Sequence, residues 1–457
     1  MIKRIEIIGL FGERDVVLNL ENKVKIIVGE NGTGKSHILN IVYYLISNQL
    51  LELMKIDFIE IKISSNDNYF ELRREELMRV YDNKEFERGA LGFLKRELSK
   101  SEFEELLIAI RLKKDIKSLS FIEERLKLNP RIRMAIRDIQ ELLKRKEINL
   151  FDLLLSENVD KLKKYLLKTY GQYQKDSILY LPTYRRIEKG LKYLVKNNNL
   201  IEEFELEDTN SLINFGMKDT QDLIDKLLSD IKNSFLKAYA TLSENMLNEL
   251  LIALDDDFIP KQITDLNIEL VELVLQRVSG KIDESDKERV LSIVKRNEAT
   301  KHNYPILSMI NNLIKLYEGS TKKLEDRIEK FVEVSNKYLI NKAFFYDKKN
   351  VTLPIINQFS NNNITIDQLS SGEKQVVSLF AKIYLNEIND FMIFFDEPEL
   401  SLSIEWQRML LNDILKTESC SFMFVTTHSP FIFEPLNLLR CTVDIDDFTT
   451  INLSREY

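Results

Sequence analysis

The sequence contains no apolar run long enough to cross a membrane, and its only cysteines are Cys420 and Cys441, with no CxxC pair. A bilayer-spanning helix needs roughly 18 consecutive apolar residues, so we expect no membrane segment. The first residues also lack the apolar stretch and small-residue cleavage site of a secretory signal. Neither a disulfide framework nor a cysteine zinc site is supported. These absences predict a cytoplasmic protein in a reducing compartment.

Charge is unevenly distributed along the chain. Asp and Glu number 73 against 65 Lys and Arg, a net charge of −8, which argues against a protein that coats nucleic acid. Residues 91–200 nevertheless hold 25 basic against 15 acidic side chains. Two interpretations stay open. The basic side chains lie on solvated helix faces, or they gather on one surface that binds nucleic acid or an acidic partner.

Hydrophobic periodicity predicts strands towards both ends of the chain and helices between them. Helical spacing of Leu, Ile and Phe fills residues 74–170 and 200–345. Within the second block, Leu324, Ile328, Phe331 and Tyr338 allow a short helical hairpin at most. Short strands are expected at 2–8, 16–20, 24–28, 57–63, 69–73, 178–181, 350–366, 391–395, 421–426, 441–445 and 450–453.

A glycine-rich segment, GENGTGKS from Gly29 to Ser36, follows a buried strand and opens an amphipathic helix. This is the context of a phosphate loop, whose glycines let backbone N–H groups face phosphate oxygens. Lys35 would neutralise β- and γ-phosphate charge, and the Ser36 hydroxyl would bind Mg²⁺. His37 is interpreted as a helix residue, not a ligand. The nucleotide-binding residues predicted here are Asn31, Gly32, Thr33, Gly34, Lys35 and Ser36.

The segment FMIFFDEPE, Phe391 to Glu399, joins five apolar residues to two adjacent carboxylates. Acids at the end of a buried strand project from the sheet edge at which α/β folds bind ligands. Asp396 suits Mg²⁺, and Glu397 suits polarising an attacking water. An acid-stabilised helix N-terminus would explain Glu399 but not the two adjacent acids that precede it.

LSSGEKQ starts at Leu369 and precedes a helical apolar segment. Ser370 and Gly372 at a helix start give backbone donors for an anion, although a simple N-cap serine would give the same pattern. The position of this segment relative to the other motifs favours the anion-binding interpretation. Gly372 lies 24 residues before Asp396, and His428, in TTHSP, lies 32 residues after Asp396.

These four motifs in this order resemble the ATP-binding heads of the ABC superfamily, in the branch that includes SMC, RecF and OLD-type ATPases. Ser371 stands where a glycine is more usual, as in the OLD-like group. The resemblance implies a homodimer or higher homo-oligomer that binds ATP and Mg²⁺, hydrolyses ATP, and sandwiches two nucleotides. Across each nucleotide, Lys35, Asp396, Glu397 and His428 of one chain would face Ser370 and Gly372 of another, with Glu397 and His428 catalytic and Ser36 and Asp396 holding the metal.

One element of such heads, the Q-loop glutamine, is not identified. Its region contains Gln172, Gln174 and Thr183, and the choice among them stays open. Nearby, Arg185 and Arg186 either contact phosphate or form ion pairs with neighbouring acids.

Residues 181–188 (LPTYRRIE), with GLFGERD and FVEVSNKYL, look like the ATPases of prokaryotic anti-phage defence operons such as Septu, PARIS and certain retrons. This resemblance implies a sensor or regulatory ATPase with a separate effector nuclease, and only 29 residues follow His428. The competing hypothesis is a RecF-like DNA-repair or chromosome-maintenance ATPase that holds duplex DNA through residues 91–200. A nucleotide-binding scaffold is a third reading, against which Glu397 argues.

Together the motifs predict an α/β fold, an ABC-type ATPase head with a mixed sheet around the phosphate loop and large helical insertions. Five parts are expected along the chain. They are an N-terminal ATPase part at 1–75, a helical insertion at 76–175, a return strand with a Q-loop-like region at 176–200, a second helical insertion at 201–345, and a C-terminal ATPase part at 346–457.

Overall fold

The computed structural model divides the chain into two compact units, Met1–Tyr184 with Asp390–Tyr457, and Arg185–Asn389. In the described residues, parallel and antiparallel strands are combined with long helices, so the predicted mixed α/β fold is confirmed. The structure describes residues 1–78, 90–99, 102–103, 106, 129, 131–137, 157–173, 177–182, 217–254, 266–278, 283–296, 300, 302–386, 390–417 and 419–452.

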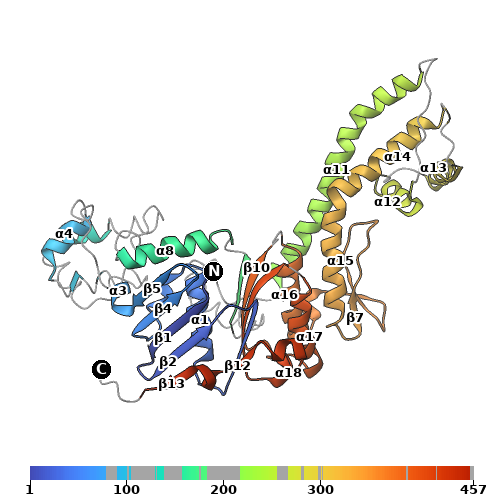
Figure 1. The fold of residues 1–457 in the computed structure, drawn as a ribbon. Coiled ribbons are helices and arrows are strands. Elements are labelled where there is room, and N and C mark those ends of the chain that lie inside the picture. The colour runs from blue at the N-terminus through green and yellow to red at the C-terminus, as the bar shows by residue number, and fades with distance from the viewer. Residues whose placement is uncertain are drawn as a thin grey trace. The chain divides into compact units, whose positions relative to one another are not determined.

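One sheet of the first unit is antiparallel, with strand order β13-β2-β1-β4-β5 (Figure 1). Apolar and polar residues alternate in these strands, so one face is buried. In β1, for example, Ile5 and Ile7 are fully buried on either side of Glu6. The strands are β1 (Arg4–Leu10), β2 (Arg14–Asn19), β4 (Glu60–Ser64), β5 (Tyr69–Arg73) and β13 (Thr449–Ile451).

The other sheet of this unit is parallel throughout, with order β12-β3-β11-β10-β6. Every residue of β10, an inner strand between β11 and β6, is buried, as expected for a parallel strand covered on both faces. Its strands are β3 (Val24–Val28), β6 (Ile178–Leu181), β10 (Phe391–Asp396), β11 (Cys420–Thr427) and β12 (Thr442–Asp444).

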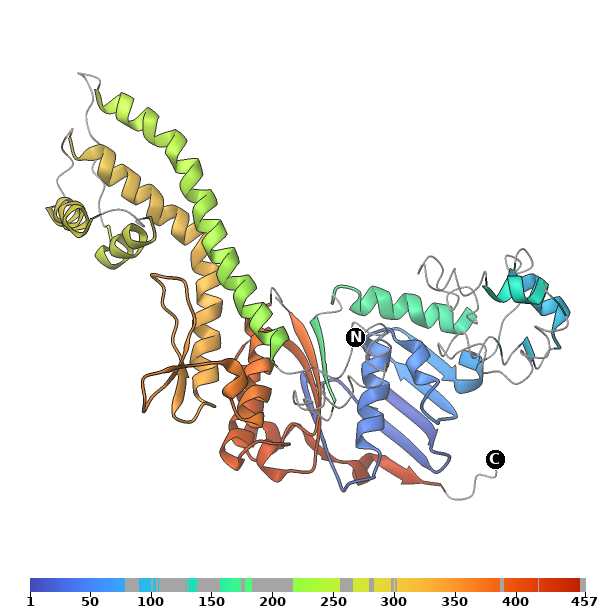
Figure 2. The same cartoon turned by 180° about the vertical axis from the view of Figure 1, so that it is seen from behind.

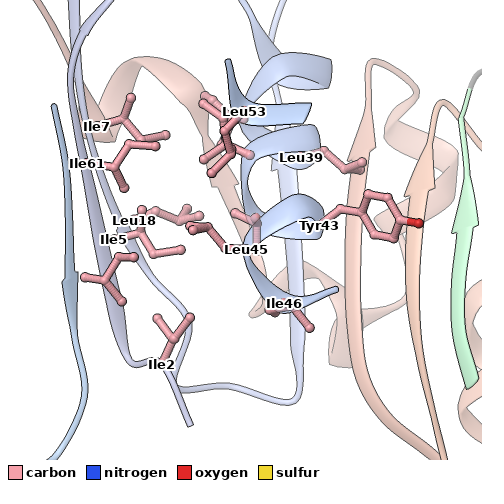
Figure 3. Packing of buried hydrophobic residues seen from close by; sticks show 14 of the residues in the cluster. Ile2, Ile5, Ile7, Leu18, Leu39, Tyr43, Leu45, Ile46, Leu53 and Ile61 are labelled. Atoms are coloured by element: carbon pink, nitrogen blue, oxygen red, sulfur yellow. The ribbon is translucent and has the colours of Figure 1, made fainter. Parts of the chain in front are cut away.

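Helix α1 (Lys35–Ile46) packs between these two sheets. In Figure 3, Leu45 faces the isoleucines of the antiparallel sheet, whereas Tyr43 faces the parallel sheet. The Tyr43 ring stacks on Tyr180 of β6 with centroids 4.2 Å apart. Tyr180 in turn donates a hydrogen bond to Asn40 Oδ1. Helix α1, which follows the phosphate loop, is therefore fixed against both sheets.

The remaining helices of the first unit lie around these sheets. Tyr165 of α8 packs on Phe70 of β5, and the Tyr170 hydroxyl accepts a hydrogen bond from Ile2 N at 2.9 Å. These helices are α2 (Leu50–Leu53), α3 (Arg74–Met78), α4 (Ala90–Glu97), α8 (Glu157–Tyr170), α17 (Ile404–Leu415), α18 (Pro430–Phe433) and α19 (Leu436–Leu439).

The second unit is built on a long helical arm in which α11 runs beside α14 and α15 (Figure 2). A π-helix, Tyr317–Thr321, joins α14 to α15. The arm and its base consist of α11 (Lys218–Leu254), α12 (Ile268–Val278), α13 (Glu284–Arg296), α14 (Tyr304–Leu316), α15 (Lys322–Asn336), α16 (Ser371–Tyr384) and a small sheet of β7 (Lys342–Phe344), β8 (Ile355–Asn357) and β9 (Asn363–Ile364).

Two of the apolar residues proposed as a hairpin seam contact other elements of the second unit. Phe331 packs on Phe344 of β7, and Tyr338 packs on Phe380 of α16. The long helix pair is formed instead by α11 with α14, which are far apart in the sequence. Phe331 thus connects α15 to β7, and Tyr338, just after α15, contacts α16.

Two expectations about element boundaries need correction. The strand β7 lies at the end of the block that was expected to be mainly helical, and the expected strand at 57–63 begins only at Glu60. Residues 346–389 belong to the second compact unit, although we assigned them to the C-terminal ATPase part. The five-part functional division stays a prediction. In the described residues, no helix is both long and apolar enough to span a bilayer.

Candidate nucleotide site

The phosphate loop connects β3 to α1. Gly32 and Gly34 have φ angles of 80° and 96°, in the left-handed region that glycine adopts without a steric cost. A Cβ on Gly32 would meet no heavy atom within 4 Å, so backbone conformation, not space, favours glycine there. The buried Lys35 ammonium donates to the carbonyl oxygens of Gly29 and Glu30, at 2.7 and 2.6 Å. The loop therefore carries a fixed positive charge beside the start of α1.

The turn between β1 and β2 covers one side of this loop. The Arg14 guanidinium donates to the Thr33 carbonyl oxygen, and Phe11 packs edge-on against His37 with centroids 4.8 Å apart. His37 is thus a packing residue of α1, as its sequence position suggested. Arg14 and Phe11 were missed as neighbours of the loop, because the GLFGERD segment that contains them has no chemical pattern of its own.

Ser36 and Asp396 meet at the carboxyl edge of the parallel sheet. Ser36 Oγ donates to Asp396 Oδ1 at 3.0 Å, and Thr426 Oγ1 donates to the same oxygen. The register explains this contact, because Asp396 of β10 pairs with Thr426 of β11. A hydroxyl and a carboxylate are oxygen ligands suited to Mg²⁺, which takes few protein ligands and completes its shell with phosphate and water. The pair therefore fits a nucleotide-bound Mg²⁺.

Glu397 follows directly and has an unusual backbone. Its φ is 48°, and its N–H donates to the Thr426 carbonyl oxygen at 2.8 Å. A non-glycine residue in this region persists where its surroundings fix it, often at functional sites. No hydrogen bond or ion pair of its carboxylate is found among the described residues. The carboxylate is thus uncommitted and next to Asp396.

Glu399, for which the sequence predicted no role in the site, contacts His428, the other predicted catalytic residue. Its Oε1 accepts a hydrogen bond from His428 N at 2.9 Å and also lies 2.9 Å from the ring nitrogen Nδ1 of His428. Glu399 is 6% exposed, whereas the His428 side chain is 44% exposed. Nothing in the sequence, apart from the presence of an acidic residue at 399, predicted this contact with His428.

The LSSGE segment lies in the second compact unit, at the start of α16. Ser370 is the N-cap, and its N–H donates to Glu373 Oε2 at 2.7 Å, which completes a capping box. Ser370 is therefore a helix-capping serine, which was one of the two interpretations of this segment. Gly372 lies in the first turn of the same helix, where unpaired backbone N–H groups favour anions. Its role towards a nucleotide stays a prediction.

Comparison of the sequence with known protein families assigns the chain to one of them. The family model described as the AAA ATPase domain matches residues 1–433. The chain belongs to this family. Its structure also matches that of the Smc head domain with an extended coiled coil bound to the C-terminal domain of ScpA from Pyrococcus furiosus. That match has 14% identity and a TM-score of 0.35, and covers 99% of this chain and 95% of the other. No curated protein matches the sequence.

Within this AAA ATPase domain, the first unit brings together the phosphate loop, Asp396, Glu397 and His428, all at the carboxyl ends of β3, β10 and β11. Ser370 and Gly372 belong to the other unit. Gln172 is exposed in the turn after α8. The other Q-loop candidates, Gln174 and Thr183, the pair Arg185 and Arg186, and most of the basic region 91–200 lie outside the described residues.

Proposed function

We propose that this ATPase-family chain binds ATP with Mg²⁺ at the phosphate loop, hydrolyses it slowly, and acts as a dimerising conformational switch. The observation that carries the proposal is the hydrogen bond between Ser36 and Asp396. It places a hydroxyl from the start of α1 against a carboxylate from the end of β10. Those two groups, beside a glycine-rich loop and the fixed ammonium of Lys35, are what a Mg²⁺-bound triphosphate needs.

Each residue has a distinct role in this proposal. Asn31, Gly32, Thr33 and Gly34 supply the loop backbone, and the Lys35 ammonium offsets phosphate charge. Bound Mg²⁺ would neutralise charge on the β- and γ-phosphates. The Glu397 carboxylate, free of partners in the described residues, orients and polarises the attacking water. His428 would donate to a γ-phosphate oxygen.

The second half of the site comes from another copy of the chain. Ser370 and Gly372, at the N-terminus of α16, present backbone donors to a γ-phosphate bound by the partner. A nucleotide that contacts both chains stabilises the closed dimer, and loss of the γ-phosphate releases it. Two such sites would form in a head-to-tail homodimer.

We further propose that the switch serves as the sensor or regulatory subunit of a cytoplasmic prokaryotic anti-phage defence complex, with a separate effector nuclease. Support comes from membership of an ATPase family and from the resemblance of GLFGERD, LPTYRRIE and FVEVSNKYL to ATPases of such systems. The alternative is a RecF-like DNA-repair ATPase that binds duplex DNA through the basic region 91–200.

The variant Glu397→Gln tests the chemistry. We expect ATP binding within about twofold of wild type, turnover lower by about 10²–10⁴-fold, and an ATP-dependent dimer detected by light scattering. Glu405→Gln, an exposed glutamate in the first turn of α17, is the matched control and should behave as wild type. Turnover at the wild-type rate in Glu397→Gln would show that another group is the base.

The same trapped variant separates the two biological roles. Isolated from its native host, it should retain a stoichiometric second protein, which mass spectrometry would identify as carrying nuclease motifs. Recovery of a bare dimer with bound DNA would favour the RecF-like alternative. In that case ATP turnover should rise with duplex DNA, and DNA affinity should fall steeply with salt.

A further inference from the structure

We propose that Glu399 is a positioning residue for His428, which fixes the ring with its hydrogen on Nδ1 and its Nε2 presented outward. This inference rests on the proposed ATPase function and deepens it. Glu399 Oε1 lies 2.9 Å from His428 Nδ1, and an ionised carboxylate can only accept hydrogen bonds, so we place the ring hydrogen on Nδ1. The other ring nitrogen, Nε2, is then the atom available to a nucleotide.

Two contacts from the same carboxylate oxygen fix the ring more tightly than one would. Oε1 accepts from the backbone N–H of His428 and lies 2.9 Å from its ring nitrogen Nδ1. The acceptor is therefore shared between the main chain and the end of the side chain, which restricts rotation about the bonds between them. The other oxygen, Oε2, is buried without a partner among the described residues. The carboxylate therefore has no other hydrogen-bond donor there to hold it or to share its charge.

The charge of Glu399 gives the contact a chemical purpose beyond orientation. Nε2 can donate to a phosphate oxygen only after the ring takes up a proton from solvent, and the ring then holds hydrogen on both nitrogens and is positively charged. The buried carboxylate on the opposite side of the ring stabilises that positive charge, as an orienting carboxylate does for other catalytic histidines. Charge that develops on the γ-phosphate is then met by a preorganised donor.

A second pair of hydrogen bonds ties the same two loops together. Gln407 of α17 donates to the Leu402 carbonyl oxygen at 3.0 Å and accepts from Ser429 Oγ at 2.6 Å. The segment after β10, which begins with Glu397, is thus joined to the segment after β11 at two points. These contacts connect the loop that contains Glu397 to the loop that contains His428, and Glu399 is the residue that contacts the imidazole.

NMR of protein with ¹⁵N in the histidine rings tests the positioning directly, since the chain has only three histidines. The signals that disappear in His428→Gln are those of His428. We expect the Nδ1–H form for His428 in the nucleotide-free wild type, and a shift towards Nε2–H in Glu399→Ala. Glu399→Gln retains an acceptor oxygen and should keep the wild-type form. An Nε2–H form in wild type, or no change in Glu399→Ala, would overturn the proposal.

Turnover gives the second test, through a double-mutant cycle. Relative to wild type, kcat should fall about 100-fold in His428→Ala and in Glu399→Ala, and about tenfold in Glu399→Gln. The double variant should be no slower than His428→Ala, because Glu399 acts through the imidazole. Additive losses would contradict this role while leaving the ATPase assignment intact. Wild-type protein without turnover would reject the proposed function, and the NMR result would still decide the positioning.

Discussion

Lys342 Nζ donates to both carboxylate oxygens of Glu373, at 2.9 and 2.7 Å. Lys342 belongs to β7, and Glu373 to the first turn of α16, where it also accepts from the Ser370 N–H. The Glu373 side chain is 3% exposed and that of Lys342 22%. The ion pair therefore offsets a negative charge at the helix N-terminus that we propose receives a γ-phosphate.

Lys342→Met should uncouple ATP binding from dimer closure. The unpaired Glu373 carboxylate would repel a γ-phosphate, so ATP-dependent dimerisation measured by light scattering should weaken, while ATP binding to the monomer stays unchanged. Loss of a charged hydrogen-bond partner should also lower the unfolding free energy by about 1.5–3 kcal/mol. Lys348→Met removes an exposed ion pair with Glu329 and should cost at most about 1 kcal/mol. Equal closure by both variants would contradict the electrostatic argument.

The same ion pair predicts a pH dependence of stability. Burial opposes ionisation of Glu373, but hydrogen bonds from Lys342 and from Ser370 outweigh it and hold the pKa of Glu373 below its ordinary value. A lowered folded-state pKa contributes stability above the unfolded-state pKa, and this stability is lost as pH falls through the folded-state value. In urea titrations, the difference between wild type and Glu373→Gln should shrink as pH is lowered from about 7 to below about 4. A constant difference would exclude this contribution.

Buried parallel strands were the part of the fold most open to prediction. Residues 391–396 read as a continuous apolar run ending in an acid, because both faces of β10 are covered. The three-residue β7 was missed, since a strand that short shows no alternation. The helix beginning at Lys35 was predictable from its glycine-rich start, but the partner of its Tyr43 ring on β6 was not.

Contacts within the candidate site were less predictable than its motifs. The bond between Glu399 and His428 joins residues 29 apart, and it depends on how the loops after β10 and β11 lie together. Lys342 is similar, because nothing in a single lysine indicates a partner at Glu373. Motif spacing identifies groups that chemistry requires, whereas the groups that orient them are fixed by strand register and packing.

Ser36→Ala and Asp396→Asn should remove the Mg²⁺ dependence of nucleotide binding. Each variant removes an oxygen ligand, so the increase in ATP affinity on adding Mg²⁺ should fall by about tenfold or more, while binding in EDTA changes little. Calorimetric titration with and without Mg²⁺ measures both quantities. Ser65→Ala, in the turn between β4 and β5, is the control and should retain the full increase. A full increase in Ser36→Ala or Asp396→Asn would show that the metal is held elsewhere.

Phe394→Ala should destabilise the first compact unit by about 3–5 kcal/mol, the usual cost of truncating a buried phenylalanine. The Phe394 ring is fully buried in β10 and contacts the rings of Tyr43, Phe422 and Phe424. Leu436→Ala, 79% exposed on α19, should change stability by less than about 0.5 kcal/mol. Chemical denaturation followed by tyrosine fluorescence gives the comparison. Similar losses for the two variants would mean that this packing is not that of the folded protein.

Mixing two inactive variants tests whether each site is shared between chains. Lys35→Ala should abolish ATP binding at its own phosphate loop. Ser370→Asp keeps an N-cap but places a negative charge where the partner's γ-phosphate is expected. Each variant alone should therefore lose turnover. In a mixed dimer, the intact Ser370 of one chain faces the intact Lys35 of the other, so one of the two sites is complete.

An equal mixture should recover up to about a quarter of wild-type turnover, because half of randomly formed dimers are mixed and each holds one complete site. Ser370→Asn provides the matched control, since it caps the helix without the charge, and it should stay active alone. Mixed dimers can be counted with two affinity tags. If they form without recovering activity, the two halves of the site do not come from different chains.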